Sequence, residues 1–389
     1  MKHLGDITKI SGYTAPIVDC IIGGSPCQDL SIAGKRAGLD GEQSGLYIEQ
    51  VRIAKEMRER DVRNERSGVD IRPRYMLWEN VAGAFSSNKG EDFRIVLEEL
   101  AKVSDKDAVI PRPADGKWRT CGCILADGWS IAWRVLDAQF WGVPQRRRRI
   151  ALVADFGGQS APEILFVRKS VSGDTDESRQ GRKAASTDFQ GSIGAGDREA
   201  FGFDGYNGVI TGDVAATIGS NCGMSTGRNG VIVTVYAVDQ GGGKSSANIT
   251  EDIAPTLCTT HGGEPAVVYA DVKKHYIVRR LTPLECERLQ GFPDAWTDIG
   301  EWTDSKGKKR KASDTARYTA LGNSIALPPW KWVLKRLCAC YERDATMASL
   351  FDGIGGFPFL WEQLNGKGSC LWASEIEEFP IAVTKERMV

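Results

Sequence analysis

Residues 348–356 read Ala-Ser-Leu-Phe-Asp-Gly-Ile-Gly-Gly, a short apolar run that meets closely spaced glycines. This pattern predicts a buried strand that turns directly into a helix, expected from about Pro358. Glycines allow backbone N–H groups and the helix N-terminus to approach a ligand, as in nucleotide-binding α/β folds. The next apolar run, 370–373, leads to Glu375, twenty positions after Gly355, where such folds place an acid that binds a ribose.

A plain structural turn is the alternative for any glycine loop taken alone. The acid at Glu375 favours the ligand-binding interpretation. The spacing is Phe-x-Gly-x-Gly-Gly rather than Gly-x-Gly-x-x-Gly, which argues against an ordinary dinucleotide site.

Short apolar runs alternate with helical patterns through the first 160 residues. The runs at 17–22, 75–78 and 150–154 predict strands, and the patterns at 47–58 and 93–103 predict helices. Residues 172–200 are loop-like in composition, and two similar turn-rich segments follow at 211–218 and 250–257. We therefore expect a mixed, mostly parallel sheet from residues 1–159 and 313–389, and a smaller β-rich domain at 160–312.

Composition narrows the class of protein. Lys and Arg total 50 against 51 Asp and Glu in 389 residues, so any basic surface for nucleic acid must be local. The absence of a signal peptide and of an apolar run of ~20 residues predicts a cytoplasmic protein with no membrane partner. The ten cysteines suit a reducing compartment. Neither Cys121-x-Cys123 nor Cys338-x-Cys340 has the usual zinc spacing, so no metal is expected.

A cysteine lies just past the first predicted strand, in Gly24-Ser25-Pro26-Cys27-Gln28. Strand ends form the ligand-binding edge of an α/β sheet, where loop N–H groups can lower a thiol pKa and favour the nucleophilic thiolate. Taken alone, such a cysteine is more often an inert packed thiol. Glu79-Asn80 follows the strand at 75–78 and should reach the same edge, with a helix-capping acid as the alternative.

A run of arginines, 146–149, precedes the predicted strand at 150–154. Arg147 and Arg149 occupy alternating positions, so we expect them to point the same way, toward a phosphate or a base carbonyl. A solvated charged surface is the alternative for this run. The basic segment 306–311 is equally compatible with phosphate contact and with a solvated loop.

Together these segments resemble the DNA cytosine-C5 methyltransferase family. The resemblance covers nearly all of the α/β part and rests on six motifs. These are Gly-Ser-Pro-Cys-Gln (24–28), Glu-Asn-Val (79–81), Gln-x-Arg-x-Arg (145–149), Arg-Leu-Thr-Pro-Leu-Glu-Cys-Glu-Arg-Leu-Gln-Gly-Phe-Pro (280–293), Gly-Asn-Ser (322–324) and Phe-x-Gly-x-Gly-Gly (351–356).

The resemblance implies a Rossmann-like S-adenosylmethionine-dependent methyltransferase domain, with residues 160–278 in the place of the target-recognition domain. Cys27 would add to C6 of a cytosine flipped out of double-stranded DNA, which makes C5 nucleophilic enough to take the methyl group. Glu79 would hold N3 and the exocyclic amine of the base. Arg149 would contact O2, and Arg147 would orient the nucleophile and the base.

The resemblance also implies a set of residues around S-adenosylmethionine. The glycine loop would lie beside the amino-acid end of the cofactor, Glu375 would bind the ribose, and Asp6 would read the adenine edge. The full set is Phe351, Gly353, Gly355, Glu375, Ile376, Asp6, Ile7, Pro26, Leu46, Asn323 and Ser324.

The order of the motifs departs from the family. The family normally begins with the glycine loop and ends with Gly-Asn-Ser, whereas here the glycine loop and Glu375 come last. We interpret this order as a circular permutation with its break between Glu375 and Asp6-Ile7, and we expect Val389 to lie near Met1. Residues 338–346 would then link the family's usual ends.

Three other functions remain open at this stage. An RNA cytosine-C5 methyltransferase would use the same chemistry, although the large 160–278 region favours duplex DNA. A catalytically silent DNA-binding relative would not need Cys27 or Glu79, and a thiol hydrolase would need a histidine motif beside the cysteine. We expect a monomer.

Overall fold

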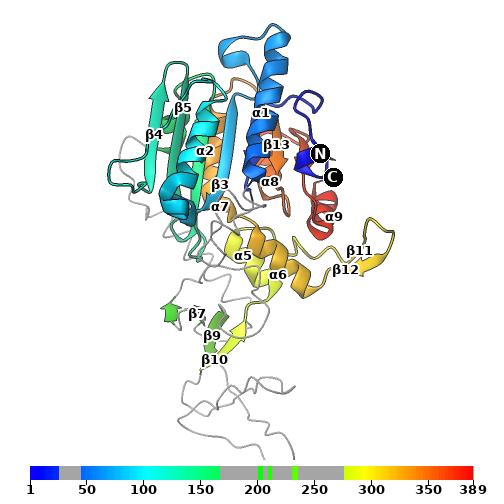
Figure 1. Cartoon of the computed structure of the whole chain (residues 1–389). Helices are drawn as coiled ribbons and strands as arrows, with labels where there is room; N and C mark the ends of the chain where they lie inside the picture. The colour runs from blue at the N-terminus through cyan, green and yellow to red at the C-terminus, as the bar shows by residue number, and fades with distance from the viewer. Residues whose placement is uncertain (26–44, 167–199, 205–208, 213–229, 235–275, 389) are drawn as a thin grey trace, which may run out of the picture.

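The computed structural model describes residues 1–25, 45–166, 200–204, 209–212, 230–234 and 276–388. Its centre is an eight-stranded sheet with the order β1-β14-β13-β2-β3-β6-β5-β4 (Figure 1). The five strands β1, β14, β13, β2 and β3 pair in parallel, and β6, β5 and β4 continue the sheet with antiparallel pairing. This confirms the expected mixed, mostly parallel sheet. The strands are β1 Lys2–His3, β2 Cys20–Gly23, β3 Tyr75–Val81, β4 Cys121–Ala126, β5 Trp129–Asp137, β6 Arg148–Asp155, β13 Met347–Leu350 and β14 Cys370–Ser374.

Helices cover both faces of this sheet, and α1 and α2 lie in front of it in Figure 1. Alternate residues of a strand point to opposite faces, so a strand buried on both sides is apolar throughout. In β2, Ile22 joins the apolar core on the side of α3, α7 and α8, whereas Ile21 packs with α1 and α2. The helices are α1 Leu46–Arg63, α2 Glu91–Ala101, α3 Ala161–Leu165, α7 Leu327–Cys338 and α8 Gly356–Asn365.

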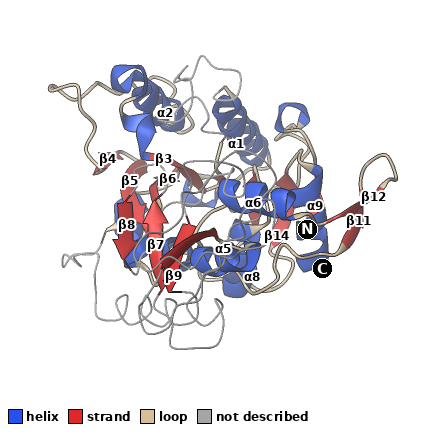
Figure 2. Ribbon diagram, turned by 90° about the horizontal axis from the view of Figure 1, so that it is seen from below, coloured by secondary structure: helices blue, strands red, loops and turns tan. Residues whose placement is uncertain are grey.

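The remaining elements lie along one end of the sheet (Figures 1 and 2). They are α5 Pro283–Gln290, α6 Asp314–Asn323, α9 Glu378–Arg387, a hairpin of β11 Glu301–Thr303 and β12 Lys309–Lys311, and an antiparallel sheet with the order β10-β9-β7-β8. The strands of that sheet are β7 Ala200–Asp204, β8 Val209–Gly212, β9 Gly230–Thr234 and β10 Tyr276–Arg280.

Buried polar contacts explain much of the motif at 280–293. Thr282 and Glu285 form a capping box at the start of α5, which satisfies two backbone N–H groups. The buried Glu287 accepts hydrogen bonds from Thr297 and Arg317, and so ties α5 to α6. Because a buried carboxylate without partners is costly, these residues specify how the two helices pack.

Several element bounds differ from the sequence expectation. Glu79 and Asn80 do not follow a strand; they belong to β3, which continues to Val81. β6 begins at Arg148 rather than at residue 150, because Arg149 pairs with Val81 of β3 and Arg148 pairs with Asp137 of β5. Side chains from α3 and α5, on the expected small-domain side of the boundary at 160, pack in the large core. The domain bounds stay a prediction, and the turn-rich segments at 213–218 and 250–257 lie outside the described residues.

The pair β13–β14 lies between β1 and β2, so the end of the chain is built into the middle of the sheet. His3 is in register with Ala373, and its imidazole lies 3.0 Å from the Thr384 hydroxyl of α9. Val389 lies outside the described residues, but α9 runs beside β1. Among the described residues, no helix combines the length and apolar character needed to cross a bilayer.

The segment between α7 and β13 is fixed to β2 by one buried carboxylate. Asp19 accepts hydrogen bonds from Arg343 Nη2 at 2.6 Å and from the backbone N and hydroxyl of Thr346 at 2.8 and 2.9 Å. Burial alone would raise the pKa of Asp19, but the bonds from Arg343 and Thr346 outweigh it and hold the pKa below its usual value. This cluster therefore locks the connection to β13.

We expect Asp19→Asn to lower the free energy of unfolding by about 2–4 kcal/mol at neutral pH, because it leaves Arg343 and Thr346 without their anionic partner. Urea titrations monitored by tryptophan fluorescence measure this difference. A folded-state pKa below the unfolded value stabilises the protein above the unfolded pKa of about 4. The difference from the parent should therefore shrink as the pH falls below that value.

Asp344→Asn is the matched control, since Asp344 is exposed beside the same segment. It should leave the unfolding free energy within about 0.5 kcal/mol of the parent. Equal losses in the two variants would contradict the role given to Asp19.

Candidate active site

Six chain segments reach one edge of the central sheet. From one side to the other, the edge carries the ends of β1, β14, β13, β2 and β3 and the start of the antiparallel β6. These ends hold Asp6, Glu375, Phe351, Gly24 and Glu79. Neighbouring strands lie about 4.8 Å apart, so about 15 Å separates the strand of Glu375 from that of Glu79. The edge thus spans the length of an extended ligand rather than a single atom.

The glycine loop leaves β13 by a sharp change of backbone direction. Phe351, Gly353 and Gly355 all have positive φ, at 56°, 56° and 79°. A Cβ on Gly355 would come within 2.8 Å of Thr384 Cγ2, whereas one on Gly353 would meet nothing within 4 Å. Gly355 is therefore needed for close packing against α9, while Gly353 faces open space that a ligand can enter.

Glu375 closes the loop from the neighbouring strand. Its carboxylate accepts hydrogen bonds from Gly353 N at 2.7 Å and from the backbone N of Ile376 at 2.7 Å. The Ile376 side chain is 68 % exposed beside it. A polar carboxylate next to an exposed apolar side chain suits a sugar and the flat ring attached to it.

The segment after β1 also reaches this edge of the sheet, beside the end of β14. Leu4 N donates to Ala373 O at 2.8 Å, which sets Asp6 next to the end of β14. The Asp6 carboxylate caps a short 3₁₀ turn by accepting from Thr8 N at 3.0 Å. The Ile7 side chain is only 3 % exposed and packs in the core, so its backbone is the part that a ligand at this edge can contact.

The loop also contains a buried acid that the sequence reasoning did not single out. Asp352 accepts a hydrogen bond from the Ser349 hydroxyl at 2.5 Å. Burial raises its pKa to about 8, so the carboxyl is protonated below that pH. The neighbouring negative charge of Glu375 acts in the same direction.

The loop that leads to Cys27 is anchored at its start. Ser25 is buried, its hydroxyl accepts from Trp78 Nε1 at 3.0 Å, and its carbonyl accepts from Asn80 Nδ2 at 3.3 Å. Pro26 and Cys27 lie outside the described residues. The anchoring pair was not foreseen, although alternation along β3 puts Trp78 and Asn80 on one face and could have suggested it.

Glu79 and Arg149 form an ion pair next to this loop. Arg149 Nε lies 3.0 Å from Glu79 Oε1, with both side chains mostly buried. A Cβ on Gly24 would lie 2.8 Å from Glu79 Oε2, so the Glu79 carboxylate lies directly against Gly24. The ion pair therefore lies against Gly24, which precedes Cys27 by three residues in the sequence.

Arg147 lies just before β6 and has other partners than Arg149, so the two side chains do not share one direction as the alternation had predicted. The Arg147 guanidinium donates to Gly322 O at 3.1 Å and to the carbonyl of Ser324. It therefore holds the turn after α6 at the active edge. Asn323 is exposed at the end of α6, and Leu46 is half-buried at the start of α1.

Comparison with known proteins bears on this site. A family model described as C-5 cytosine-specific DNA methylase matches residues 1–104 and 126–339. The matched ranges exclude residues 347–389, which hold the glycine loop and Glu375.

Individual relatives are distant. A protein of Escherichia phage P1 named DNA N-6-adenine-methyltransferase is 28% identical over 89% of this chain and 56% of its own length. The chain thus spans about half of that relative. Type II methyltransferase M1.ScrFI of Lactococcus lactis subsp. cremoris is 25% identical over 87% of this chain and 67% of its own. The match to the structure of S. pombe Dnmt2 methyltransferase spans 85% of this chain and 82% of that protein's chain. The two are 14% identical, with a TM-score of 0.41.

The two loop glycines should respond differently to substitution. Gly355→Ala adds a methyl group against Thr384 at a positive φ, and should lower the unfolding free energy by about 2–5 kcal/mol. Gly353→Ala meets no atom and should cost about 1–2 kcal/mol for the backbone conformation alone. Urea unfolding of the two variants tests this order. Equal losses would mean that Gly353 does not face open space.

Proposed function

The chain belongs to the C-5 cytosine-specific DNA methylase family, and on that premise we propose that it methylates C5 of cytosine in double-stranded DNA with S-adenosylmethionine as donor. The observation that carries the proposal is the Glu79–Arg149 ion pair beside Gly24, which precedes Cys27 by three residues in the sequence. The glycine loop and Glu375 lie on the same sheet edge.

The residues at the far side of the edge fit the proposed cofactor. Gly353 faces open space, Glu375 offers a carboxylate for ribose hydroxyls, and the exposed Ile376 offers an apolar surface for adenine. Asp6 adds an acceptor for the adenine amine, and Phe351, Leu46, Pro26, Asn323 and Ser324 complete the proposed pocket. When bound, S-adenosylmethionine supplies an electrophilic methyl group.

The chemistry assigned to the chain follows from the weak nucleophilicity of cytosine C5. The Cys27 thiolate adds to C6 of the flipped-out base, and the electron pair of the C5–C6 double bond becomes available at C5. Glu79 holds N3 and the exocyclic amine, and Arg149, already paired with Glu79, contacts O2. After methylation, loss of the C5 proton and expulsion of the thiolate restore the aromatic ring.

Arg147 acts as a positioning residue in this proposal. Its bonds to the carbonyls of Gly322 and Ser324 hold the turn that carries Asn323 against the active edge. The segment with β7 to β10 is proposed to supply the target-recognition surface within residues 160–278, where phosphate and base contacts have separate roles.

The strand order supports the circular permutation. Counted from β13, the chain order β13, β14, β1, β2, β3 appears across the sheet as 3-2-1-4-5. That is the order of a doubly wound nucleotide-binding sheet, with its glycine loop after the first strand and its acid after the second. We propose that residues 339–346 join ends that are free in the usual family order, and that α9 precedes β1 in space as it would there in sequence.

The activity is tested by incubating the full chain with methyl-labelled S-adenosylmethionine and mixed-sequence duplex DNA, and identifying the labelled nucleoside by mass spectrometry. We expect 5-methyl-2′-deoxycytidine. Cys27→Ser should lower the rate by about a thousandfold or more, because no thiolate can add to C6. Cys121→Ser, an exposed thiol on β4, is the matched control and should keep the parent rate.

Two outcomes would overturn the proposal. Labelled N6-methyl-2′-deoxyadenosine as the product would assign this chain the activity named for the phage P1 relative. Label in RNA but not in DNA would assign it an RNA substrate.

A covalent complex with duplex containing 5-fluorocytosine should persist in the parent and be absent in Cys27→Ser, because fluorine cannot leave C5 as a proton does.

The permutation is tested by restoring the usual order. A variant opened between Ala339 and Cys340, with Val389 joined to Met1 by a short flexible linker, should unfold cooperatively and methylate DNA at a rate within about tenfold of the parent. Opening the same joined chain inside α7, between Val333 and Leu334, should destroy the fold because both residues are buried. An inactive, unfolded first variant would contradict the proposed permutation.

A further inference from the structure

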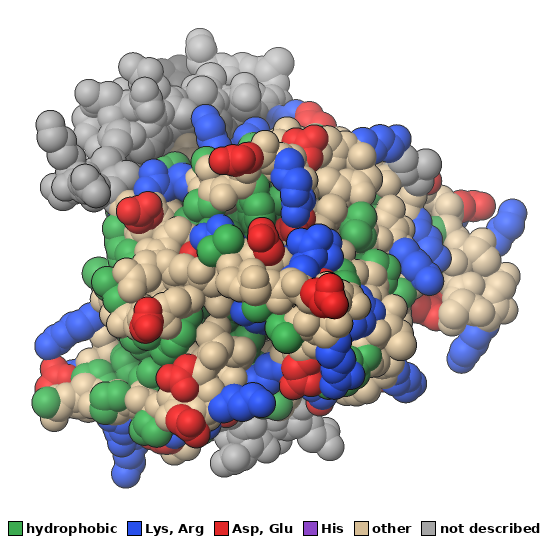
Figure 3. All heavy atoms as spheres, turned by 90° about the horizontal axis from the view of Figure 1, so that it is seen from above, with side chains coloured by type: hydrophobic (Ala, Val, Ile, Leu, Met, Phe, Trp, Pro, Cys, Tyr) green, Lys and Arg blue, Asp and Glu red, His purple; other side chains and the backbone are tan. Residues whose placement is uncertain are grey.

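The hairpin of β11 and β12 concentrates positive charge. Between residues 300 and 312, which we call the basic hairpin, the chain has the cations Lys306, Lys308, Lys309, Arg310 and Lys311 and the acids Glu301 and Asp304. The whole chain has a net charge of -1. Lys/Arg and Asp/Glu side chains are interspersed over the face seen in Figure 3. The basic hairpin is therefore a local exception to a balanced surface.

Most of this charge is not neutralised within the molecule. Arg310 pairs with Asp304 at 2.9 Å. Within the described part of the chain, no carboxylate forms an ion pair with any of the four lysines of the basic hairpin, although Glu301 is in register with Lys311. All four lysines are exposed. Their ammonium groups are consequently available to an external anion.

The turn that carries these lysines is ordered by a buried acid. Asp304 Oδ1 accepts from the backbone N of Lys306 at 3.0 Å and of Lys308 at 2.8 Å, and Asp304 N donates to Lys308 O at 3.0 Å. Its other oxygen binds Arg310. Because the turn is pre-formed, placing the lysines against a ligand costs less conformational entropy than it would from a flexible tail.

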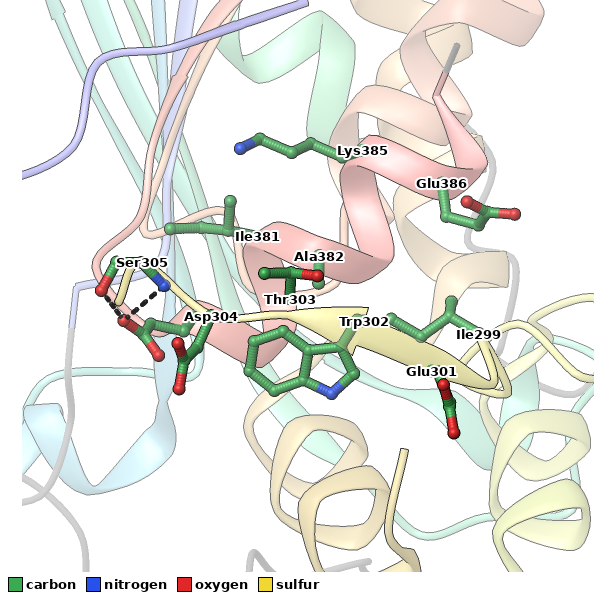
Figure 4. A pocket seen from close by; sticks show the side chains of 11 residues that line it. Ile299, Glu301, Trp302, Thr303, Asp304, Ser305, Ile381, Ala382, Lys385 and Glu386 are labelled. Carbon is green, nitrogen blue, oxygen red and sulfur yellow. Dashed lines mark hydrogen bonds between the residues drawn. The ribbon is translucent and has the colours of Figure 1, made fainter. Parts of the chain in front are cut away.

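The basic hairpin is also attached to α9. Ser305 N donates to Glu378 Oε1 at 3.3 Å, and the Trp302 ring packs against Phe379 with 5.9 Å between centroids. Between these contacts, β11 and α9 enclose a hollow of about 550 Å³, with Ser305 at one end and Ile299 at the other (Figure 4). The hairpin is thus held as an arm that projects from the body in Figure 1.

The supports of the arm lead directly to the proposed active edge. Glu378, which binds Ser305, comes three residues after Glu375. The arm connects α5 to α6, and α6 ends at Asn323, next to the turn held by Arg147. Its lysines are therefore fixed relative to the edge at which a bound duplex would present its target base.

We propose that the basic hairpin binds the phosphate backbone of duplex DNA beside the target base. The inference rests on the proposed function for its choice of polyanion. Unpaired lysines attract phosphates without reading sequence, so the arm adds affinity and orients the duplex while other residues choose the base. Each phosphate contact releases counterions, so the contribution of the arm depends on salt.

The test compares two quadruple variants of the full chain. Lys306→Ala, Lys308→Ala, Lys309→Ala and Lys311→Ala together remove the free charge of the arm and keep the Arg310–Asp304 pair. The matched control replaces Lys106, Lys117, Lys335 and Lys367 by Ala, which removes the same charge from exposed positions elsewhere. Fluorescence anisotropy measures binding to a mixed-sequence duplex of about 40 base pairs over a range of salt concentrations.

We expect the slope of log affinity against log salt to fall in magnitude by roughly 2 to 4 in the arm variant and to change little in the control. Between about 50 and 200 mM salt, the fold loss of affinity in the arm variant should be roughly 15 to 250 times smaller than the fold loss in the parent. In methylation assays its KM for DNA should rise while kcat at saturating DNA stays at the parent value.

Equal salt slopes for the arm variant and the control would overturn the inference, as would a fall in kcat with an unchanged KM. Unchanged binding to DNA together with a selective loss of binding to single-stranded RNA would assign the arm to another polymer and also overturn it. The binding measurement needs no methyl transfer. A parent that methylates DNA while the slopes are equal refutes only the arm, and a parent that methylates nothing refutes the proposed function.

Discussion

The parallel pairing of β13 with β2 is the contact on which the rest of the structure depends. Its register aligns Leu350 with Gly23, so the glycine loop and the loop that leads to Cys27 start from adjacent points of one edge. Side chains of these strands are buried on both faces, and moving the register by one residue would turn each of them to the opposite face. Burial in two apolar cores therefore fixes the geometry of the site.

Buried polar groups then set the details that apolar packing leaves open. Asp19 holds the connection into β13, Glu287 joins α5 to α6, and Arg147 holds the turn after α6. Leaving such a buried group without its partners costs more free energy than its hydrogen bonds contribute to the net stability of the fold. Such groups are therefore better at excluding alternative arrangements than at stabilising the fold as a whole.

The charges of the molecule follow a different logic from its core. Acids and bases nearly balance over the chain, so long-range attraction to a polyanion is weak unless cations gather locally. The basic hairpin gathers them on a pre-formed turn, and its contact with Glu378 attaches it to the start of α9, three residues after Glu375. Within the proposed reaction, positioning of the duplex and choice of the base are assigned to separate surfaces.

Some features of this protein follow from the sequence alone. The runs at 17–22, 75–78 and 348–351 predict buried strands, because strands buried on both faces are mostly apolar, and the glycines after 352 predict the loop. The motifs identify the family because few residue types can perform each of the roles proposed for them. The ion pair of Glu79 with Arg149 could not be predicted from the sequence. It forms because β3 and β6 are antiparallel neighbours in the sheet, although β4 and β5 separate them in the chain.

Tertiary structure alone decided three further points. Ile7 is buried, Arg147 turns to the Gly322 and Ser324 carbonyls, and the lysines of the basic hairpin lack acidic partners within the described residues. Periodicity in a sequence reports which residues can be buried or exposed, and motifs report which chemistry is available. Neither periodicity nor motifs show which distant group a side chain contacts. Those contacts depend on strand order and register, which arise only when the whole core packs.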